Sequence, residues 1–207
     1  MPRTLLPEPG LVYPETMLVY LHGLNSGGGS AKAAWLRQNL APIPVLSPTY
    51  PVERAEAAAD FLQAYLVRAR LEHPEDERLV LVGSSLGGFY AQYLAPQFDA
   101  RLVLINPAIY PERDLRNRLG PNRNPATGED YLLTEDDVRA FERLRIPHCN
   151  PQVPTLVLLD EGDELLDYRE AEAFYRGCGK ILVYPGGNHR FEHLPQAGDE
   201  IVRLHDT

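Results

Sequence analysis

Six short segments rich in Val, Leu and Ile recur along the chain, separated by stretches with helical spacing. Each is six or seven residues long, and they cover residues 17–23, 42–48, 78–83, 101–106, 155–160 and 180–186. Their apolar character is nearly continuous, which is typical of strands buried on both faces of a parallel sheet. The pattern therefore predicts an α/β fold, with a mainly parallel sheet of about six strands and helices on both faces.

Helices are expected between these strands. Residues 84–95 follow the third strand and end at Pro96, which cannot continue a helix. Two further helices are predicted at 167–176 and 195–206. A longer helix is predicted over 53–71, with one apolar face formed by Ala57, Phe61, Leu62, Tyr65 and Ala69.

The interval between the fourth and fifth strands is much longer than a usual crossover connection. It begins with a segment rich in Pro, Arg and Asn, and a helix is predicted at 134–144 with Thr134 as its N-cap. We interpret residues 107–150 as a small cap inserted over the active site of a single domain that spans 1–207. The alternative is a surface excursion without a functional role.

Charge and cysteine content limit the classes of partner. The chain has 20 Lys and Arg against 29 Asp and Glu, a formal net charge of −9. This balance disfavours nucleic acid or an anionic membrane, because both attract clustered basic residues. No segment reaches the roughly 20 apolar residues of a membrane span, and the N-terminus lacks the apolar core of a signal peptide. Cys149 and Cys178 are predicted to be free thiols in a reducing compartment, so the cytoplasm is the expected location.

The segment after the third strand, Gly83-Ser84-Ser85-Leu86-Gly87, matches the pattern G-x-S-x-G. A serine at the tip of a tight strand-to-helix turn takes a strained backbone conformation that exposes its hydroxyl. The positions two before and two after that serine need to lack a Cβ, and Gly83 and Gly87 meet this need. Ser85 is therefore the predicted nucleophile, and Ser84, which lacks glycines at the matching positions, is predicted to be structural.

A serine nucleophile needs a positioned general base, and an acid orients that base. Behind an elbow of this kind the order along the chain is Ser, acid, His. His189 follows the last strand on a glycine-rich loop and is the predicted base. The acid is expected just after the apolar residues 155–159 of the fifth strand, where Asp163 has the best placement and Asp160, nearly part of the strand, is the main alternative. Glu161, Glu164 and Asp167 compete in the same loop.

His193 lies four residues after His189, a spacing that also occurs in metal-binding pairs. No third ligand stands out in the sequence, so neither a metal nor an organic cofactor is predicted.

Two backbone amides are expected to form the oxyanion hole. One is that of Leu86, directly after the nucleophile, and the other comes from the loop after the first strand, where Leu24 is the expected donor. His22 in this loop is predicted to brace it, and Asn25 and Ser26 are predicted to line the substrate pocket.

Together these motifs resemble the YqiA/YcfP-type bacterial esterases, a small-size branch of the α/β-hydrolases. The resemblance spans residues 18–194, beyond an extension of about fifteen residues at the N-terminus. It is carried by YLHGLNS with Lys32 downstream, VGSSLGGFYAQYLA, INPA, NPATGEDY, GDELLDY and GGNHRFEH. The resemblance implies an α/β-hydrolase fold, esterase or thioesterase activity on acyl esters and acyl-CoA thioesters, and no cofactor. It also implies a triad of Ser85, Asp163 and His189.

The function expected from the sequence is therefore a serine hydrolase that works through an acyl-enzyme intermediate on a small-molecule ester or thioester. One alternative is a non-catalytic scaffold of the same fold that binds a ligand or partner. Another is a serine hydrolase with peptidase or lactonase specificity, since fold alone does not choose among these. The acyl-chain length, the leaving group and the oligomeric state are not predicted.

Overall fold

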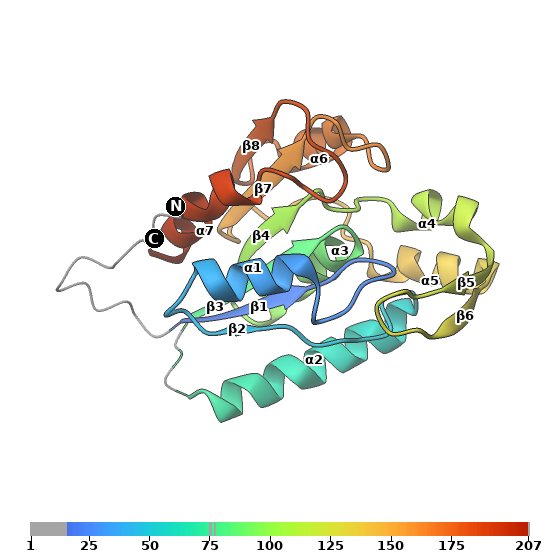
Figure 1. The fold of residues 1–207 in the computed structure, drawn as a ribbon, viewed down its shortest axis with the longest axis horizontal. Coiled ribbons are helices and arrows are strands. Elements are labelled where there is room, and N and C mark those ends of the chain that lie inside the picture. Colours follow the sequence, from blue (N-terminus) through green and yellow to red (C-terminus); the bar gives the residue numbers. More distant parts are fainter. Residues whose placement is uncertain (1–15, 75, 77, 207) are drawn as a thin grey trace.

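The centre of the molecule is a six-stranded sheet in the computed structural model, which describes residues 16–74, 76 and 78–206 (Figure 1). The strands are all parallel, in the order β2-β1-β3-β4-β7-β8. They are β1 (Thr16–Leu21), β2 (Val45–Leu46), β3 (Arg78–Ser84), β4 (Arg101–Ile105), β7 (Thr155–Asp160) and β8 (Lys180–Tyr184). The predicted parallel sheet is confirmed, whereas the predicted N-terminal extension lies outside the described residues.

Helices cover both faces of the sheet, as predicted. On one face lie α2 (Ala55–Glu72), α3 (Leu86–Leu94) and α6 (Tyr168–Tyr175), and on the other lie α1 (Ala31–Asn39) and α7 (Leu194–Asp206). Side chains along a strand alternate between the two cores, because successive residues point to opposite faces. In β1, for example, Val19 packs with the α2 side and Leu18 with the α1 side.

The long interval between β4 and β7 is ordered. It contains α4 (Pro111–Asp114), a 3₁₀ turn η2 (Arg116–Arg118), a hairpin of β5 (Gly120–Arg123) and β6 (Asp130–Leu133), and α5 (Glu135–Leu144). The predicted N-cap is present: the Thr134 hydroxyl accepts the Asp137 amide and the Asp137 carboxylate accepts the Thr134 amide. Phe141 packs edge-on against Phe89 of α3 with ring centroids 5.5 Å apart, so the segment is anchored to the sheet domain.

The predicted apolar face of α2 is partly wrong. Leu62 and Ala69 are buried as expected, but Phe61 is 41% exposed and Ala57 is also exposed. The buried stripe is instead formed by Ala55, Ala58, Ala59, Leu62, Leu66 and Ala69. Alanines occur all round this helix, so the sequence offers little contrast between its two sides.

The prediction of two free thiols is also wrong, because Cys149 and Cys178 form a disulfide, with Cα atoms 6.1 Å apart. The bond joins the segment before β7 to the connection between α6 and β8. A single pair of cysteines has no spacing pattern that identifies it as a pair, so tertiary packing alone brings the two together. The disulfide removes the support that cysteine usage gave to a cytoplasmic location, which stays a prediction.

Reduction of this disulfide is expected to lower the free energy of unfolding by about 3.6 kcal/mol, the loop-entropy value for a separation of 29 residues. Urea denaturation with and without dithiothreitol measures the difference. The double variant Cys149→Ser/Cys178→Ser serves as control, since it should show the same loss and no response to the reductant. Identical unfolding curves for the oxidised and reduced chain would contradict the expectation.

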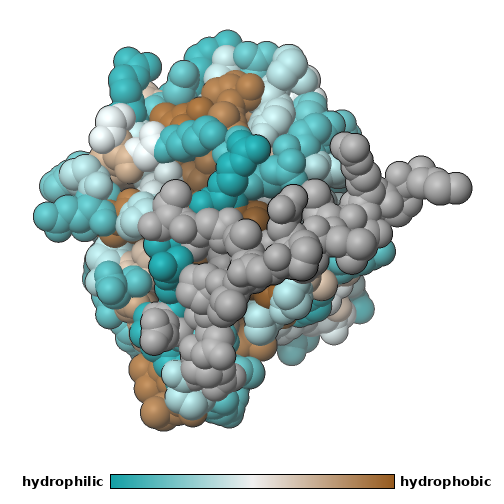
Figure 2. Space-filling view, turned by 90° about the vertical axis from the view of Figure 1, so that its left-hand side faces the viewer, coloured by the Kyte–Doolittle hydropathy of each residue, from teal (hydrophilic) through white to brown (hydrophobic). Residues whose placement is uncertain are grey.

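On the side that faces left in Figure 1, the described surface is largely hydrophilic, and its hydrophobic residues form separate small groups (Figure 2). Among the residues that the structure describes, no helix combines the length and the apolar character needed to cross a membrane.

Candidate active site

Ser85 lies at the turn between β3 and α3 in a backbone conformation that is rare for a residue with a side chain (φ 55°, ψ −122°). Such a conformation costs about 1–3 kcal/mol and persists only where the surroundings enforce it. Here the Ser85 amide donates to the Ile105 carbonyl at 3.1 Å, and the Ala108 amide donates to the Ser85 carbonyl at 3.1 Å. The end of β4 therefore holds the turn in its strained form.

Three glycines make room for this turn. A Cβ at Gly83 would collide with the Gly87 carbonyl, and a Cβ at Gly87 would collide with the carbonyl of Leu21 in β1. A Cβ at Gly23 would lie 3.0 Å from the Ser85 Cβ, which brings the loop after β1 directly against the serine. The glycine requirement predicted from the sequence thus has a steric cause on each side of Ser85.

Replacing Gly87 with alanine is expected to destabilise the fold by about 2–3 kcal/mol, because the added methyl meets backbone atoms that cannot rotate away. Gly29→Ala is the matched control: nothing lies within 4 Å of an added Cβ there, and its effect should stay within about 0.5 kcal/mol. Thermal unfolding followed by circular dichroism compares the two. Equal melting temperatures for both variants would show that the elbow is not tightly packed.

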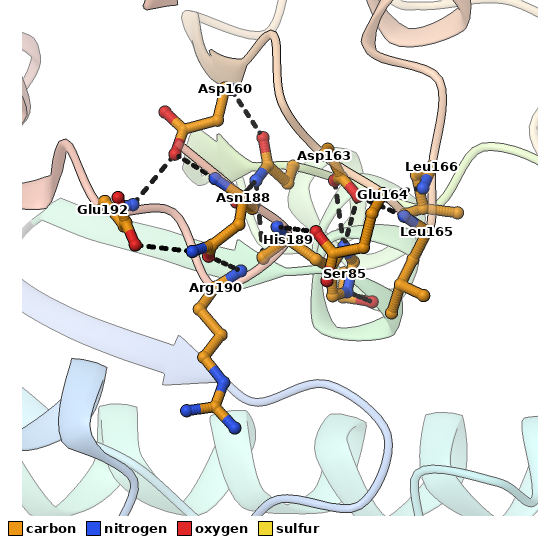
Figure 3. A network of polar contacts seen from close by, with 11 residues as sticks. Ser85, Asp160, Asp163, Glu164, Leu165, Leu166, Asn188, His189, Arg190 and Glu192 are labelled. Atoms are coloured by element: carbon orange, nitrogen blue, oxygen red, sulfur yellow. Dashed lines mark hydrogen bonds and ion pairs between the residues drawn. The ribbon is translucent and has the colours of Figure 1, made fainter. Parts of the chain in front are cut away.

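His189 lies between Ser85 and Asp163, and hydrogen bonds connect the three side chains (Figure 3). The distance from His189 Nε2 to Ser85 Oγ is 3.1 Å, and His189 Nδ1 lies 3.0 and 2.9 Å from the two carboxylate oxygens of Asp163. The His189 side chain is 18% exposed and that of Asp163 only 2%. The structure thus brings together the three residues predicted as nucleophile, base and acid.

The loop after β7 fixes the Asp163 carboxylate. Its Oδ1 accepts the backbone amides of Leu165 and Leu166, both at 2.9 Å. The neighbouring Glu164 accepts the backbone amide of His189 at 2.9 Å, and this bond holds the pKa of the Glu164 carboxyl below its usual value. The loop therefore binds both the ring and the backbone of His189.

Asp160, the alternative acid, is fully buried at the end of β7 and pairs with a different histidine. Its Oδ1 lies 2.7 Å from His193 Nδ1, and its Oδ2 accepts the amides of Asn188 and Glu192 at 3.2 and 2.9 Å. These contacts anchor both ends of the loop that carries His189 (Figure 3). His193 thus belongs to the anchor of the loop rather than to a pair with His189.

Asn106, at the end of β4, adds a second anchor to the same loop. Its side-chain oxygen accepts the Asp160 amide at 2.9 Å, and its Nδ2 donates to the carbonyl of Asn188 at 3.1 Å. Asn106 has a positive φ of 41°, a conformation that asparagine tolerates better than most residues.

The amides predicted for an oxyanion hole belong to two fixed segments. Leu86 is the first residue of α3, where a helix has no internal acceptor for its amides. Leu24 follows Gly23 in the loop after β1, and His22 braces that loop as expected. The His22 carbonyl accepts the Tyr50 hydroxyl at 2.6 Å, its ring contacts the Tyr50 ring, and burial lowers the pKa of the imidazole.

A cavity of about 740 Å³ opens above Ser85 and His189. Both predicted pocket residues line it, but Asn25 is also tied to β6, since its side-chain oxygen accepts the Tyr131 hydroxyl at 2.8 Å. The segment 107–150 contributes part of the wall, with Pro111, Asp114, Leu115, Asn117, Arg118, Pro125 and Ala126.

Three basic residues of the wall were missed from the sequence as parts of the site: Lys32, Arg118 and Arg190. Arg190 directly follows the predicted base in the sequence, and that adjacency is the signal that could have identified it. Lys32 was noted only as part of a family motif, and Arg118 belongs to the interval whose structure was not predicted in detail.

Residues 17–206 match the model of one protein family, described as Uncharacterised protein family (UPF0227). A UPF0227 protein of Pectobacterium atrosepticum is 25% identical over 186 residues, covering 86% of this chain and 92% of the relative. This agrees with the resemblance to YqiA/YcfP-type proteins.

Several solved structures share the fold, including one from Butyrivibrio proteoclasticus and one from Thermogutta terrifontis. Est1E from Butyrivibrio proteoclasticus with bound ferulic acid superimposes with a TM-score of 0.73 at 17% identity, covering 91% of this chain and 86% of that one. A thermophilic esterase from Thermogutta terrifontis gives a TM-score of 0.66 at 18% identity, covering 93% and 91%. The chain has the α/β-hydrolase fold, and by the match over residues 17–206 it belongs to the UPF0227 family.

Proposed function

We propose that the chain is a serine hydrolase that cleaves acyl esters or acyl thioesters, with Ser85 as nucleophile, His189 as general base and Asp163 as the acid. The observation that carries the proposal is the continuous contact from Ser85 Oγ through the imidazole to the carboxylate, at 3.1 and 2.9 Å. It occurs at a strained elbow on the wall of a cavity. Nucleophile, base and orienting acid in hydrogen-bond contact are what acyl transfer by serine requires.

The reaction follows from this geometry in two steps. Ser85 Oγ attacks the acyl carbonyl while His189 Nε2 takes its proton, and Asp163 stabilises the imidazolium through Nδ1. The oxyanion that forms is bound by the amides of Leu86 and Leu24, each such donor being worth about 3 kcal/mol. The alcohol or thiol leaves with the proton from His189. Water, activated by the same base, then releases the acid and restores Ser85.

The cavity supports a substrate with an apolar acyl chain. The apolar part of its wall includes Leu24, Leu86, Ala108, Pro111, Leu115, Leu165 and Leu166. We propose that the segment 107–150 acts as a cap that completes this wall within a single domain. The thermophilic esterase of Thermogutta terrifontis shares the fold, and its name favours ester hydrolysis over peptidase or lactonase activity.

A fluorophosphonate probe tests the proposal directly, because it reacts only with an activated serine. We expect labelling of Ser85, located by peptide mass spectrometry, together with hydrolysis of 4-nitrophenyl butyrate and butyryl-CoA. Labelling should be lost in His189→Ala, in which the nucleophile stays but the base is removed. An unlabelled Ser85 in a folded chain that hydrolyses neither substrate would favour the non-catalytic scaffold.

A further inference from the structure

The cavity above Ser85 is lined by more positive than negative charge, although the chain as a whole carries −9. Lys32, Arg118 and Arg190 line it, and Asp114 is the one carboxylate among the described residues of its wall. The Asp114 Oδ1 accepts two hydrogen bonds from Arg113 at 2.8 and 2.7 Å, its buried Oδ2 has no hydrogen-bond partner among the described residues, and burial raises the pKa of the carboxyl. Asp114 pairs with Arg113 and with none of the three cations of the cavity wall.

Lys32 occupies an unfavourable position for a lysine. It is the second residue of α1, whose N-cap is Ser30, and the first turn of this helix contains no acidic residue. The amino end of a helix carries a partial positive charge, so a cation there is repelled and an anion is attracted. Burial and the charge of Arg190 lower the pKa of the Lys32 ammonium to about 8.

No hydrogen bond or ion pair joins the Lys32 ammonium to any of the residues that the structure describes. The carboxylates of Asp160 and Asp163 attract it through space, but each is bound to a histidine ring. A half-buried cation without a partner, at the positive end of a helix, is an arrangement that a bound anion would stabilise.

The two arginines of the cavity differ from most others in the described part of the chain. Elsewhere arginines commonly contact carboxylates, as in Arg143 with Glu56 at 2.7 Å and Arg113 with Glu170 at 2.6 Å. Neither Arg118 nor Arg190 forms an ion pair with a described residue. Figure 3 shows the Arg190 guanidinium pointing away from the hydrogen-bonded network that holds His189.

We propose that this side of the cavity is an anion subsite, and that the substrate is an ester that also carries an oxyanion such as a carboxylate or phosphate. Lys32 and Arg190 bind the oxyanion together with the first-turn amides of α1, and Arg118 contributes from the segment 107–150. The apolar wall takes the rest of the substrate while its ester carbonyl meets Ser85. This assignment of the substrate class rests on the proposed hydrolase function.

Matched substrate pairs test the proposal through turnover. Mono-4-nitrophenyl glutarate and 4-nitrophenyl valerate differ by a carboxylate against a methyl group on the acyl side. The esters 4-carboxyphenyl butyrate and 4-methylphenyl butyrate differ in the same way on the leaving group. In the wild type the anionic member is expected to have the higher kcat/KM in one pair. In Lys32→Met/Arg190→Leu the anionic-to-neutral ratio of that pair should fall at least tenfold.

Lys180→Met is the matched control, because Lys180 is the only other lysine in the chain and pairs with Glu200 away from the cavity. It should leave both ratios unchanged. The pair that responds identifies which half of the ester carries the charge. Ratios that agree within twofold between the wild type and the double variant, in both pairs, would overturn the anion subsite.

A binding experiment separates failure of the subsite from failure of the proposed hydrolase function. Monomethyl glutarate is titrated into Ser85→Ala by calorimetry, and into Ser85→Ala with the Lys32→Met and Arg190→Leu changes added. The dissociation constant is expected to be at least fivefold higher for the triple variant than for Ser85→Ala. If it is, but the wild type hydrolyses no ester, the anion subsite is retained and the hydrolase function is rejected. If the wild type hydrolyses esters but the two variants bind monomethyl glutarate equally, the hydrolase function is retained and the anion subsite is rejected.

Discussion

Replacing Ser85 with alanine is expected to lower kcat for 4-nitrophenyl butyrate by about 10⁴- to 10⁶-fold, leaving only what binding and the oxyanion donors supply. The reason is that the acyl-enzyme route disappears with Oγ, which lies 3.1 Å from His189 Nε2. Stability should change little, because the β-carbon stays and the strained backbone is retained. Initial rates at saturating substrate, with melting curves of both proteins, measure the effect.

Ser84→Ala is the control for this variant. Ser84 is also buried beside the cavity, but it ends β3 and its side chain faces Tyr20. Burial raises the pKa of the Tyr20 hydroxyl to about 12, and hydrogen bonds with Ser30 and Ser84 oppose that rise. We expect Ser84→Ala to keep kcat within about tenfold of the wild type. Loss of activity in Ser84→Ala but not in Ser85→Ala would identify Ser84 as the nucleophile.

The sheet could be predicted because its strands are buried on both faces and read as continuous apolar runs. The edge strand β2 is the exception: of the predicted 42–48 only Val45–Leu46 pair with β1. Proline cannot donate a backbone hydrogen bond to a ladder, so Pro44 and Pro48 confine the pairing to the short stretch between them.

Elements that bury little were missed. Only Ala33 and Leu36 of α1 are buried, too few to give a helical period. Strand β5 has the sequence Gly-Pro-Asn-Arg, and the first three of these residue types are depleted in strands, so the hairpin had no sequence signal. The first residues of α1 line the cavity with Ala31 and Lys32, and Arg118, Pro125 and Ala126 line it on either side of β5. The sequence therefore predicted a nucleophile in more detail than the pocket around it.

The turn at Ser85 could be predicted because the residues that it needs lie close by in the sequence. At Gly83 and Gly87 the missing Cβ avoids a collision with a backbone atom near Ser85. The acid was harder, because Asp160 and Asp163 lie three residues apart after one strand and only the folded loop assigns each to its histidine. Asp163 contacts His189 and Asp160 contacts His193. The assignment of Asp163 as the catalytic acid and of Asp160 as a structural residue stays a prediction. The substitutions Asp163→Asn and Asp160→Asn distinguish the two roles.

Asp163→Asn is expected to lower kcat by about 10⁴-fold with little loss of stability. The Asp163 Oδ1 accepts the amides of Leu165 and Leu166, so an asparagine keeps its oxygen there and places its NH₂ group toward His189 Nδ1. Nδ1 must then accept a hydrogen bond, which puts the ring proton on Nε2. In that tautomer Nε2 cannot take the proton of Ser85, so the geometry survives and the base is lost.

Asp160→Asn is expected to have the opposite effect. The free energy of unfolding should fall by about 2–3 kcal/mol, because the substitution leaves buried donors of the loop without a full set of acceptors. The kcat should fall at most tenfold. Its Oδ2 accepts two loop amides and its Oδ1 contacts His193, whereas an asparagine offers only one acceptor oxygen. Urea denaturation and kcat on 4-nitrophenyl butyrate are measured for both variants. If Asp160→Asn were the catalytically dead variant and Asp163→Asn the unstable one, Asp160 would be the acid. Because each carboxylate binds a different histidine, Asp163→Asn should lose catalytic activity and Asp160→Asn should destabilise the loop that carries His189.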